Sequence, residues 1–213
     1  MPNFELRVED LSHPGTRIFF ANVNPEEALR EAVVSVCSWF TKQATRSDRP
    51  LHSVQNVRLV LRNMPGVAYT TGSYTHKEIH FALSHIENSA TRARDEIRGV
   101  LTHEMVHCFQ YNAKGTCPGG LIEGIADWVR LNAGLGPPHW KEGRGRKWDA
   151  GYESTAYFLS WIEAQSGRGT IRNLNLGLED RQYSDAVFQD LTGSSIQDLW
   201  RLYRLDLETR GVV

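Results

Sequence analysis

The stretch Leu101-Thr-His-Glu-Met-Val-His-Cys-Phe-Gln110 constrains the fold of this chain more than any other part of it. It contains His103, Glu104 and His107 in the pattern H-E-x-x-H. Residues four apart lie on one face of an α-helix, so a helix here would let both imidazoles reach a single metal ion. Glu104 would then be placed to take a proton from a metal-bound water, as in zinc metallopeptidases. The simpler interpretation is a helix that carries two surface histidines.

The residues around this motif favour the metal interpretation. Six apolar residues flank or interrupt it: Val100, Leu101, Met105, Val106, Cys108 and Phe109. We therefore expect a helix that is buried on most sides. Histidine and glutamate side chains in such a helix need partners, because unpaired polar groups are costly to bury.

A second segment, 120–128, carries two acidic residues at the same spacing. Glu123 and Asp127 are four apart in an otherwise apolar helical pattern, where like charges repel each other slightly. A zinc ion bound by Glu123, with Asp127 accepting the outer N–H of a ligand histidine, would relieve this repulsion, since ligand histidines usually have such a partner. The alternative is a pair of carboxylates on the surface.

The composition limits the kind of protein. With 213 residues, of which 40% are hydrophobic, the chain is long enough for one globular domain with its own core. A net charge of −1 gives no reason to expect nucleic acid or a membrane as partner, and no apolar run reaches the length of a membrane span. The N-terminus shows no signal segment, so the protein is expected to be cytoplasmic, or secreted with its signal removed. The oligomeric state is left open.

The periodicity of the chain predicts an α+β fold. Strands are expected at 4–8, 17–22, 57–62, 66–70 and 77–83, with a helix opened by the capping box Asn24-Pro-Glu-Glu27. Helices dominate from residue 91 onward. We therefore predict one domain over 1–213, with a small twisted sheet and its packed helix in 1–90, a helical lobe in 91–213 and a metal site within 103–127. Strand 77–83, the last before the metal helix, would offer an edge to an extended substrate.

Three cysteines and several tyrosines complete the set of candidate residues. Cys37, Cys108 and Cys117 do not form a disulfide framework, although Cys108 and Cys117 could pair in an oxidising compartment. Tyr152 follows a glycine-bounded loop, and its phenol is our candidate to stabilise an oxyanion. The competing candidates for this donor are Tyr111, Tyr157 and His139.

Taken together, these motifs resemble a known family. The segments 103–110, 120–128, 148–152 and 155–161 are similar to the plant basic secretory protein family of zinc peptidases, which also has fungal and bacterial members. The order H-E-x-x-H followed by E-x-x-x-D also resembles the gluzincins, of which thermolysin is the best-known member. This resemblance implies a zincin-like fold, with His103, His107 and Glu123 as ligands of one Zn²⁺ ion and Asp127 supporting a ligand histidine.

The sequence thus predicts a zinc-dependent metallopeptidase that acts on peptides or proteins. Glu104 would be the general base that activates a zinc-bound water, and Tyr152 the donor to the oxyanion. Two other functions stay open at this point. One is a non-catalytic, zinc-stabilised binding or defence protein of the same fold. The other is a zinc hydrolase for a non-peptide amide or ester.

Overall fold

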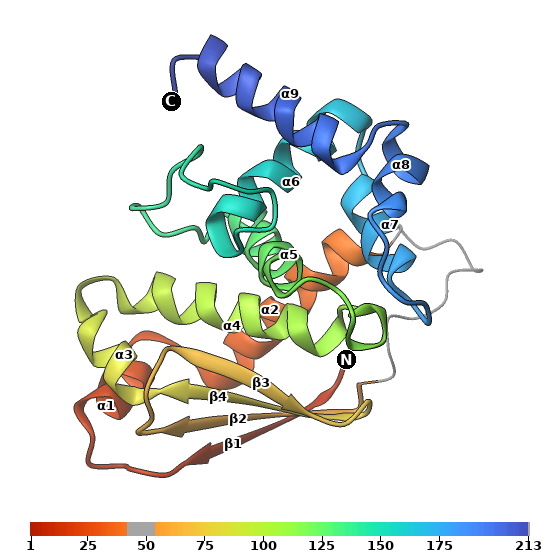
Figure 1. Ribbon diagram of the computed structural model, residues 1–213. Helices are drawn as coiled ribbons and strands as arrows, with labels where there is room; N and C mark the ends of the chain where they lie inside the picture. Colours follow the sequence, from red (N-terminus) through yellow and green to blue (C-terminus); the bar gives the residue numbers. More distant parts are fainter. Residues whose placement is uncertain (42–53, 213) are drawn as a thin grey trace. The chain divides into compact units, whose positions relative to one another are not determined.

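The computed structural model of the chain describes residues 1–41 and 54–212, and it has the expected mixed α+β architecture. These residues group into two compact units. The first comprises Met1–Phe109 with Ala133–Pro137, and the second comprises Gln110–Asn132 with Pro138–Val213. The strands belong to the first unit, and the second is helical (Figure 1). The single metallopeptidase domain expected over 1–213 stays a prediction.

One sheet organises the first unit. Within the described residues it has four strands in the order β1-β2-β4-β3, namely β1 (Asn3–Val8), β2 (Asn56–Arg62), β4 (His76–Ala82) and β3 (Ala68–Gly72). The first three are parallel to their neighbours, and β3 runs antiparallel to β4. The expectation that 77–83 forms an open edge is therefore wrong, because β3 folds back and pairs with the outer side of β4.

Helices cover one face of this sheet. The helices of the first unit are α1 (Pro14–Asn22), α2 (Pro25–Phe40), α3 (Leu83–Asn88) and α4 (Ala93–Phe109). In Figure 1, α2 and α4 lie over the sheet, where α2 contacts β1 and α4 contacts β3 and β4. The side chains of Leu59 and Ile79, paired across β2 and β4, are fully buried. The core of the unit therefore lies between these helices and the sheet.

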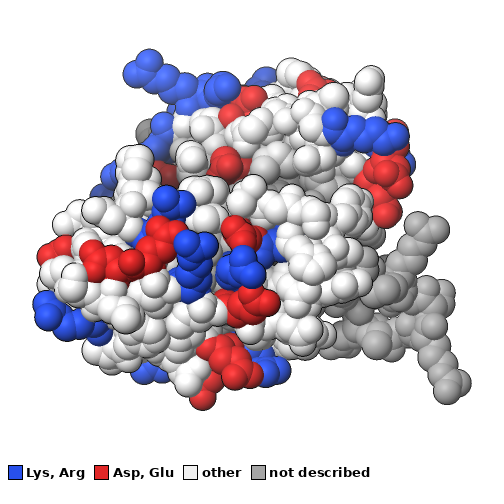
Figure 2. All heavy atoms as spheres, turned by 90° about the horizontal axis from the view of Figure 1, so that it is seen from below, with Lys and Arg blue, Asp and Glu red and all other residues white. Residues whose placement is uncertain are grey.

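The opposite face of the sheet carries ion pairs. Arg58 on β2 contacts Glu5 on β1 at 2.7 Å and Glu78 on β4 at 2.8 Å, and these three residues lie side by side in the register. Seen from below, Lys and Arg side chains lie next to Asp and Glu side chains (Figure 2). Such a polar face is typical of a sheet that packs helices on one side only.

Helix caps explain where the first two helices begin. As predicted, Asn24 caps α2 by accepting a hydrogen bond from the backbone of Glu27 at 3.1 Å. The strand expected at 17–22 is wrong, because these residues lie in α1. There the His13 Nδ1 atom accepts a hydrogen bond from Gly15 at 3.0 Å, and Pro14 occupies the first turn. This imidazole cap favours a helix, although the apolar run in the segment suggested a strand.

The second unit consists of helices packed through close backbone contacts and aromatic rings. Its helices are α5 (Gly119–Asn132), α6 (Tyr152–Ser166), α7 (Thr170–Gly177), α8 (Ala186–Thr192) and α9 (Ile196–Thr209). Gly124 allows α5 to approach α6, since a Cβ atom there would collide with Thr155. Phe158 of α6 packs edge-to-face on Trp200 of α9, with ring centroids 5.1 Å apart. No helix in the described ranges is long and apolar enough to cross a membrane.

Candidate metal centre

The H-E-x-x-H motif lies in α4, as predicted, and α4 is buried on most of its surface. Nearly every residue from Ile97 to Phe109 is buried, and only 8% of His103 and 4% of Glu104 are exposed to solvent. Its flank toward the sheet packs on β3 and β4, and it also packs against α2. The polar side chains of the motif are therefore held in a fixed, largely apolar environment. The simpler interpretation, a helix with two histidines on its surface, does not fit this burial.

The two imidazoles of the motif converge. The Nε2 atoms of His103 and His107 are 3.1 Å apart, and the ring planes meet at 82°. Two Zn–N bonds of ~2.05 Å at a tetrahedral angle would hold the two nitrogens about 3.3 Å apart. The observed separation is close to this value, so the pair has the geometry of two ligands of one ion.

The carboxylate of Glu104 has one partner in the described part of the chain, the hydroxyl of Thr70. The Oγ1 atom of Thr70 lies 2.7 Å from Oε2 of Glu104 and 3.0 Å from the backbone oxygen of the same residue. The Oε1 atom of Glu104 has no hydrogen-bond partner among these residues. One oxygen is therefore fixed by the protein, and the other is available to a water molecule or a substrate.

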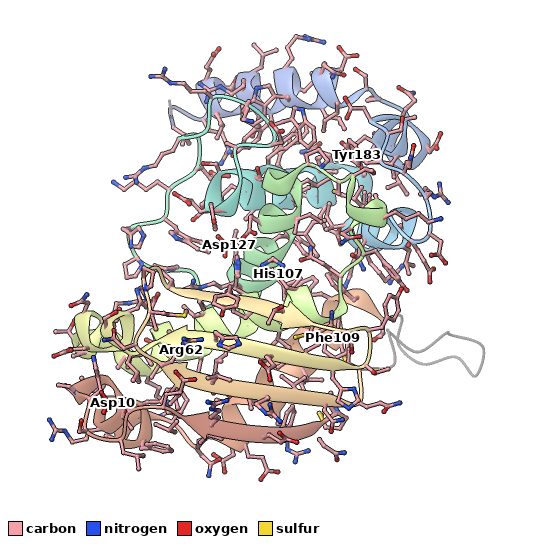
Figure 3. The ribbon with its side chains drawn as sticks, turned by 60° about the horizontal axis from the view of Figure 1, so that its bottom comes forward. Asp10, Arg62, His107, Phe109, Asp127 and Tyr183 are labelled. Atoms are coloured by element: carbon pink, nitrogen blue, oxygen red, sulfur yellow. The ribbon has the colours of Figure 1, made fainter. Side chains whose placement is uncertain are left out.

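The acidic pair of the second segment lies on α5, also as predicted. Asp127 is buried, with 2% of its surface exposed, and Glu123 is half-buried (Figure 3 labels Asp127 on α5 and His107 on α4). A surface pair of carboxylates, the alternative at this position, is therefore excluded. Of the described His, Cys, Asp and Glu residues, His103, His107 and Glu123 form a group that could hold one metal ion.

Two glycines near Glu123 fix the position of α5. A Cβ atom at Gly120 would collide with the backbone oxygen of Asp149, and one at Gly124 would collide with Thr155. Both positions therefore require glycine for the close approach of α5 to the segment that leads into α6. Because these glycines lie three residues before and one residue after Glu123, the packing of α5 sets the position of this carboxylate.

Tyr152 is the first residue of α6, and its backbone is strained. Its φ angle is +46°, a left-handed conformation that a non-glycine residue rarely adopts, and 55% of the residue is exposed. Thr155 holds the chain just before it, since its hydroxyl accepts a hydrogen bond from Gly151 at 2.9 Å and donates one to Trp148 at 2.8 Å. The phenol is thus accessible and starts from a constrained backbone, as a donor to a substrate requires.

The competing donors have different surroundings. The hydroxyl of Tyr111 donates to Glu179 at 3.0 Å, so it already has a carboxylate partner. Burial, together with the nearby negative charges of Glu142 and Glu153, raises the pKa of Tyr157. His139 is exposed.

The cysteines are not candidates for metal binding. All three are free thiols. Burial raises the pKa of Cys108 to about 12, with a further contribution from the charge of Glu104, and burial alone raises that of Cys117 to about 12. Within the described ranges, the group of residues that could hold a metal ion includes none of the cysteines.

Thr70 is the site residue that the sequence did not reveal. It lies 34 positions before Glu104 and belongs to no motif. The contact depends on the pairing of β3 with β4, which places Thr70 opposite Ile79 and toward the helices. The only local indication was the strand expected at 66–70, whose alternation does not identify the partner of a hydroxyl.

One of the comparisons with known proteins identified a family. The model of one family, described as peptidases of plants and bacteria, matches residues 1–203 and so includes the H-E-x-x-H motif, Glu123, Asp127 and Tyr152. Neither the curated proteins nor the solved structures gave a match. Since the family model covers nearly the whole chain, the resemblance to basic secretory proteins is confirmed, and this chain belongs to that family of peptidases of plants and bacteria.

Proposed function

We propose that this protein is a zinc-dependent peptidase whose active site is built on His103, Glu104 and His107. The observation that carries the proposal is the convergence of the two imidazole Nε2 atoms, 3.1 Å apart, on a buried helix that also carries the glutamate. A structural role for the metal alone would not require Glu104, whose Oε1 atom has no partner in the described residues. Membership of a peptidase family supports hydrolysis as the reaction.

The donor set fits zinc. Two imidazoles and one carboxylate are the three protein ligands of several catalytic zinc sites, which keep a fourth position for water or substrate. In this proposal Glu123 is the third ligand, and Asp127 accepts the outer N–H of a ligand histidine, which fixes the orientation of that ring. When bound, the zinc ion would polarise the substrate carbonyl and lower the pKa of a water molecule to about 7.

Glu104 would act as the general base and then as the general acid. Its Oε1 atom takes one proton from water as the water oxygen forms a bond to the carbonyl carbon of the substrate. The same carboxyl group then gives this proton to the amide nitrogen as the C–N bond breaks. The second proton of the water stays with the products, which are a carboxylic acid and an amine or, after transfer of that proton, a carboxylate and an ammonium ion, and Glu104 ends in its starting state.

Tyr152 would stabilise the charge that develops on the substrate. During the attack the carbonyl oxygen gains negative charge, and a phenol O–H directed at it lowers the energy of the transition state. The exposure and the constrained backbone of Tyr152 support this role over those of Tyr111 and Tyr157.

The outer edge of β3, which has no strand beside it in the described residues, supports a peptide substrate. Val67 accepts a hydrogen bond from Ala82, and Ser73 donates one to His76, so the odd-numbered residues of this strand bond to β4. Bonded and non-bonded residues alternate in antiparallel pairs, and therefore Thr70 directs its backbone N–H and C=O to the outer edge. An extended peptide could add there as a further strand.

Metal content and peptidase activity, measured on the wild type and on Glu104→Gln, test the proposal. Glutamine keeps the size of the side chain but cannot accept the proton. We expect both proteins to bind about one zinc per chain and Glu104→Gln to cleave an unfolded protein substrate at least ~10²-fold more slowly. Asp95→Asn, at an exposed position of the same helix, serves as the control and should retain full activity.

Other results of this experiment would indicate other functions. A wild type that binds zinc and cleaves esters or simple amides, but no peptide, would be a non-peptide hydrolase. A protein that binds zinc and cleaves nothing, with or without Glu104, would be a binding protein. A wild type that binds no zinc would contradict the proposal at its first step.

A further inference from the structure

The hydroxyl of Thr70 is the partner on which the buried Glu104 carboxylate depends. Only 4% of Glu104 is exposed, and among the described residues Thr70 alone donates a hydrogen bond to its side chain, at 2.7 Å. A buried carboxylate without a donor is costly, so this contact favours one rotamer of Glu104 over the others. It also selects which carboxylate oxygen is engaged, since Oε2 is bound and Oε1 is left for chemistry.

The sheet holds Thr70 in place for this contact. Thr70 pairs with Ile79 in the register of β3 and β4, and its side chain points to the face of the sheet that α4 covers. A β-branched side chain has few χ1 rotamers, so the hydroxyl has little freedom to move away. The next residue, Thr71, is exposed, and by the alternation of a strand its side chain points to the opposite face of the sheet.

The same hydroxyl can serve both protonation states of Glu104. It has one hydrogen but two acceptors within reach, the carboxylate Oε2 at 2.7 Å and the backbone oxygen of Glu104 at 3.0 Å. While Glu104 is ionised, the hydroxyl donates to Oε2. When Oε1 carries the proton taken from water, Oε2 is the carbonyl oxygen of the carboxyl group and still accepts the hydrogen bond from the hydroxyl. The contact therefore need not break while Glu104 receives and releases a proton.

From this geometry we infer that Thr70 is a positioning residue for the reaction, one that holds the Glu104 carboxylate with Oε1 directed to the reacting water. This inference rests on the proposed role of Glu104 as the base. Without Thr70, the side chain would sample other rotamers, and fewer molecules would have the base within reach of water. Substrate binding and metal binding would change little, because in the described part of the chain the hydroxyl makes its hydrogen bonds to Glu104 and not to His103 or His107.

Two substitutions of Thr70 isolate the hydroxyl. Thr70→Val has the same shape and the same preference for a strand but no donor, whereas Thr70→Ser keeps the donor and loses the methyl group. We expect Thr70→Val to lower kcat about 10- to 100-fold, with KM within twofold and zinc content unchanged. Thr70→Ser should recover most of this loss. Thr71→Val, the same substitution one residue further along β3, should behave like the wild type.

A second measurement detects the contact without activity. In the metal-free protein, Thr70→Val should lower Tm in the wild-type background, because it leaves the carboxylate without a donor. It should not lower Tm in a Glu104→Leu background, where no carboxylate needs one. Equal Tm shifts in the two backgrounds would show that the two residues are not coupled and would overturn the inference.

The two readouts separate this inference from the proposed function. If the Tm shifts show coupling and no variant, including the wild type, cleaves peptides, then the peptidase function fails while the contact stands. If the wild type is active and Thr70→Val keeps its kcat, then the function stands and the positioning role is wrong. A loss of kcat that Thr70→Ser does not restore would also contradict it, because that loss would come from packing.

Discussion

The two units of this protein would supply the proposed site in different ways. The first unit provides three residues from five consecutive positions on one buried helix, His103, Glu104 and His107. The second provides single residues from separate elements, namely Glu123 and Asp127 on α5 and Tyr152 at the start of α6. In the first unit, helix geometry alone brings the imidazoles together. In the second, the position of each residue depends on how helices and loops pack.

This difference predicts different consequences of mutation. A change in the first unit removes a ligand or the base directly, while the scaffold around α4 stays intact. In the second unit, a change at a residue that has no functional group of its own can displace one, because α5 is held by glycine contacts rather than by a motif. The motif should therefore tolerate few substitutions at its polar positions, whereas the second unit should be sensitive at its close contacts.

The largest effect is expected from the loss of an imidazole. His107→Ala leaves at most two protein ligands, so zinc should be lost on dialysis and peptidase activity should become undetectable. Metal analysis of the dialysed protein measures the first result, and hydrolysis of an unfolded protein measures the second. The control is His76→Ala, at an exposed histidine of the same unit. A His107→Ala protein that kept the zinc content of the wild type would show that the metal binds elsewhere.

A smaller effect is expected at the start of α6. Tyr152→Phe removes only the hydroxyl, and the loss of one donor to a developing oxyanion costs roughly 10²- to 10³-fold in kcat. KM and zinc content should stay near their wild-type values, because the phenol is needed in the transition state. Tyr157→Phe provides the comparison. If the loss of kcat occurs there instead, the oxyanion donor is Tyr157, and the strained backbone of Tyr152 has another origin.

On α5 the expected effect is on affinity rather than on chemistry. Asp127→Asn keeps the size of the buried side chain but removes its charge, which weakens its hold on the N–H of a ligand histidine. Such partners typically contribute about 10- to 100-fold to metal affinity. Competition with a zinc chelator measures this change, with the exposed Asp190→Asn as the control. An unchanged zinc affinity would mean that Asp127 is buried for a structural reason.

The contrast between the units also explains what the sequence could predict. The spacing in 101–110 was sufficient for the motif helix, since residues four apart meet on any helix. The helix that begins after Asn24 could also be predicted from the sequence, because its cap is a local hydrogen bond. The role of Thr70 could not be predicted, because its contact with Glu104 depends on which strand lies beside β4. The same dependence on strand order made the edge predicted at 77–83 wrong.

The error at 17–22 has a related cause. The short apolar run in this segment fits a strand, but the start of the helix is set by two residues that precede the segment, the His13 imidazole and Pro14. Histidine is an uncommon N-cap residue, so the sequence pattern did not indicate that a helix begins here. Within the proposed site, Glu123 and Asp127 were predicted because they repeat the spacing of the histidines. The glycines that hold them could not be identified, since their role is to make room for residues from another helix.

The smallest effect, and the sharpest test of the comparison, concerns Gly124. Alanine favours a helix interior by about 1 kcal/mol over glycine, yet its Cβ would collide with Thr155, whose hydroxyl is held by Gly151 and Trp148. Overpacking of this kind typically costs ~1–3 kcal/mol, so Gly124→Ala should lower Tm by several degrees and weaken zinc binding through Glu123. Gly119→Ala, with open space around its Cβ, should not lower Tm.

A compensating substitution distinguishes a steric cause from any other. Thr155→Ser keeps the hydroxyl and its two hydrogen bonds but removes the methyl carbon, which at 2.2 Å is the nearer of the two Thr155 side-chain atoms that the new Cβ would meet, the other being the Thr155 Cβ at 2.5 Å. The double variant Gly124→Ala/Thr155→Ser should therefore recover part of the lost Tm and of the zinc affinity. If Gly124→Ala itself changes neither Tm nor zinc affinity, the packing of α5 against α6 does not set the position of Glu123. The second unit would then hold its ligand by another means, and the contrast drawn between the two units would fail.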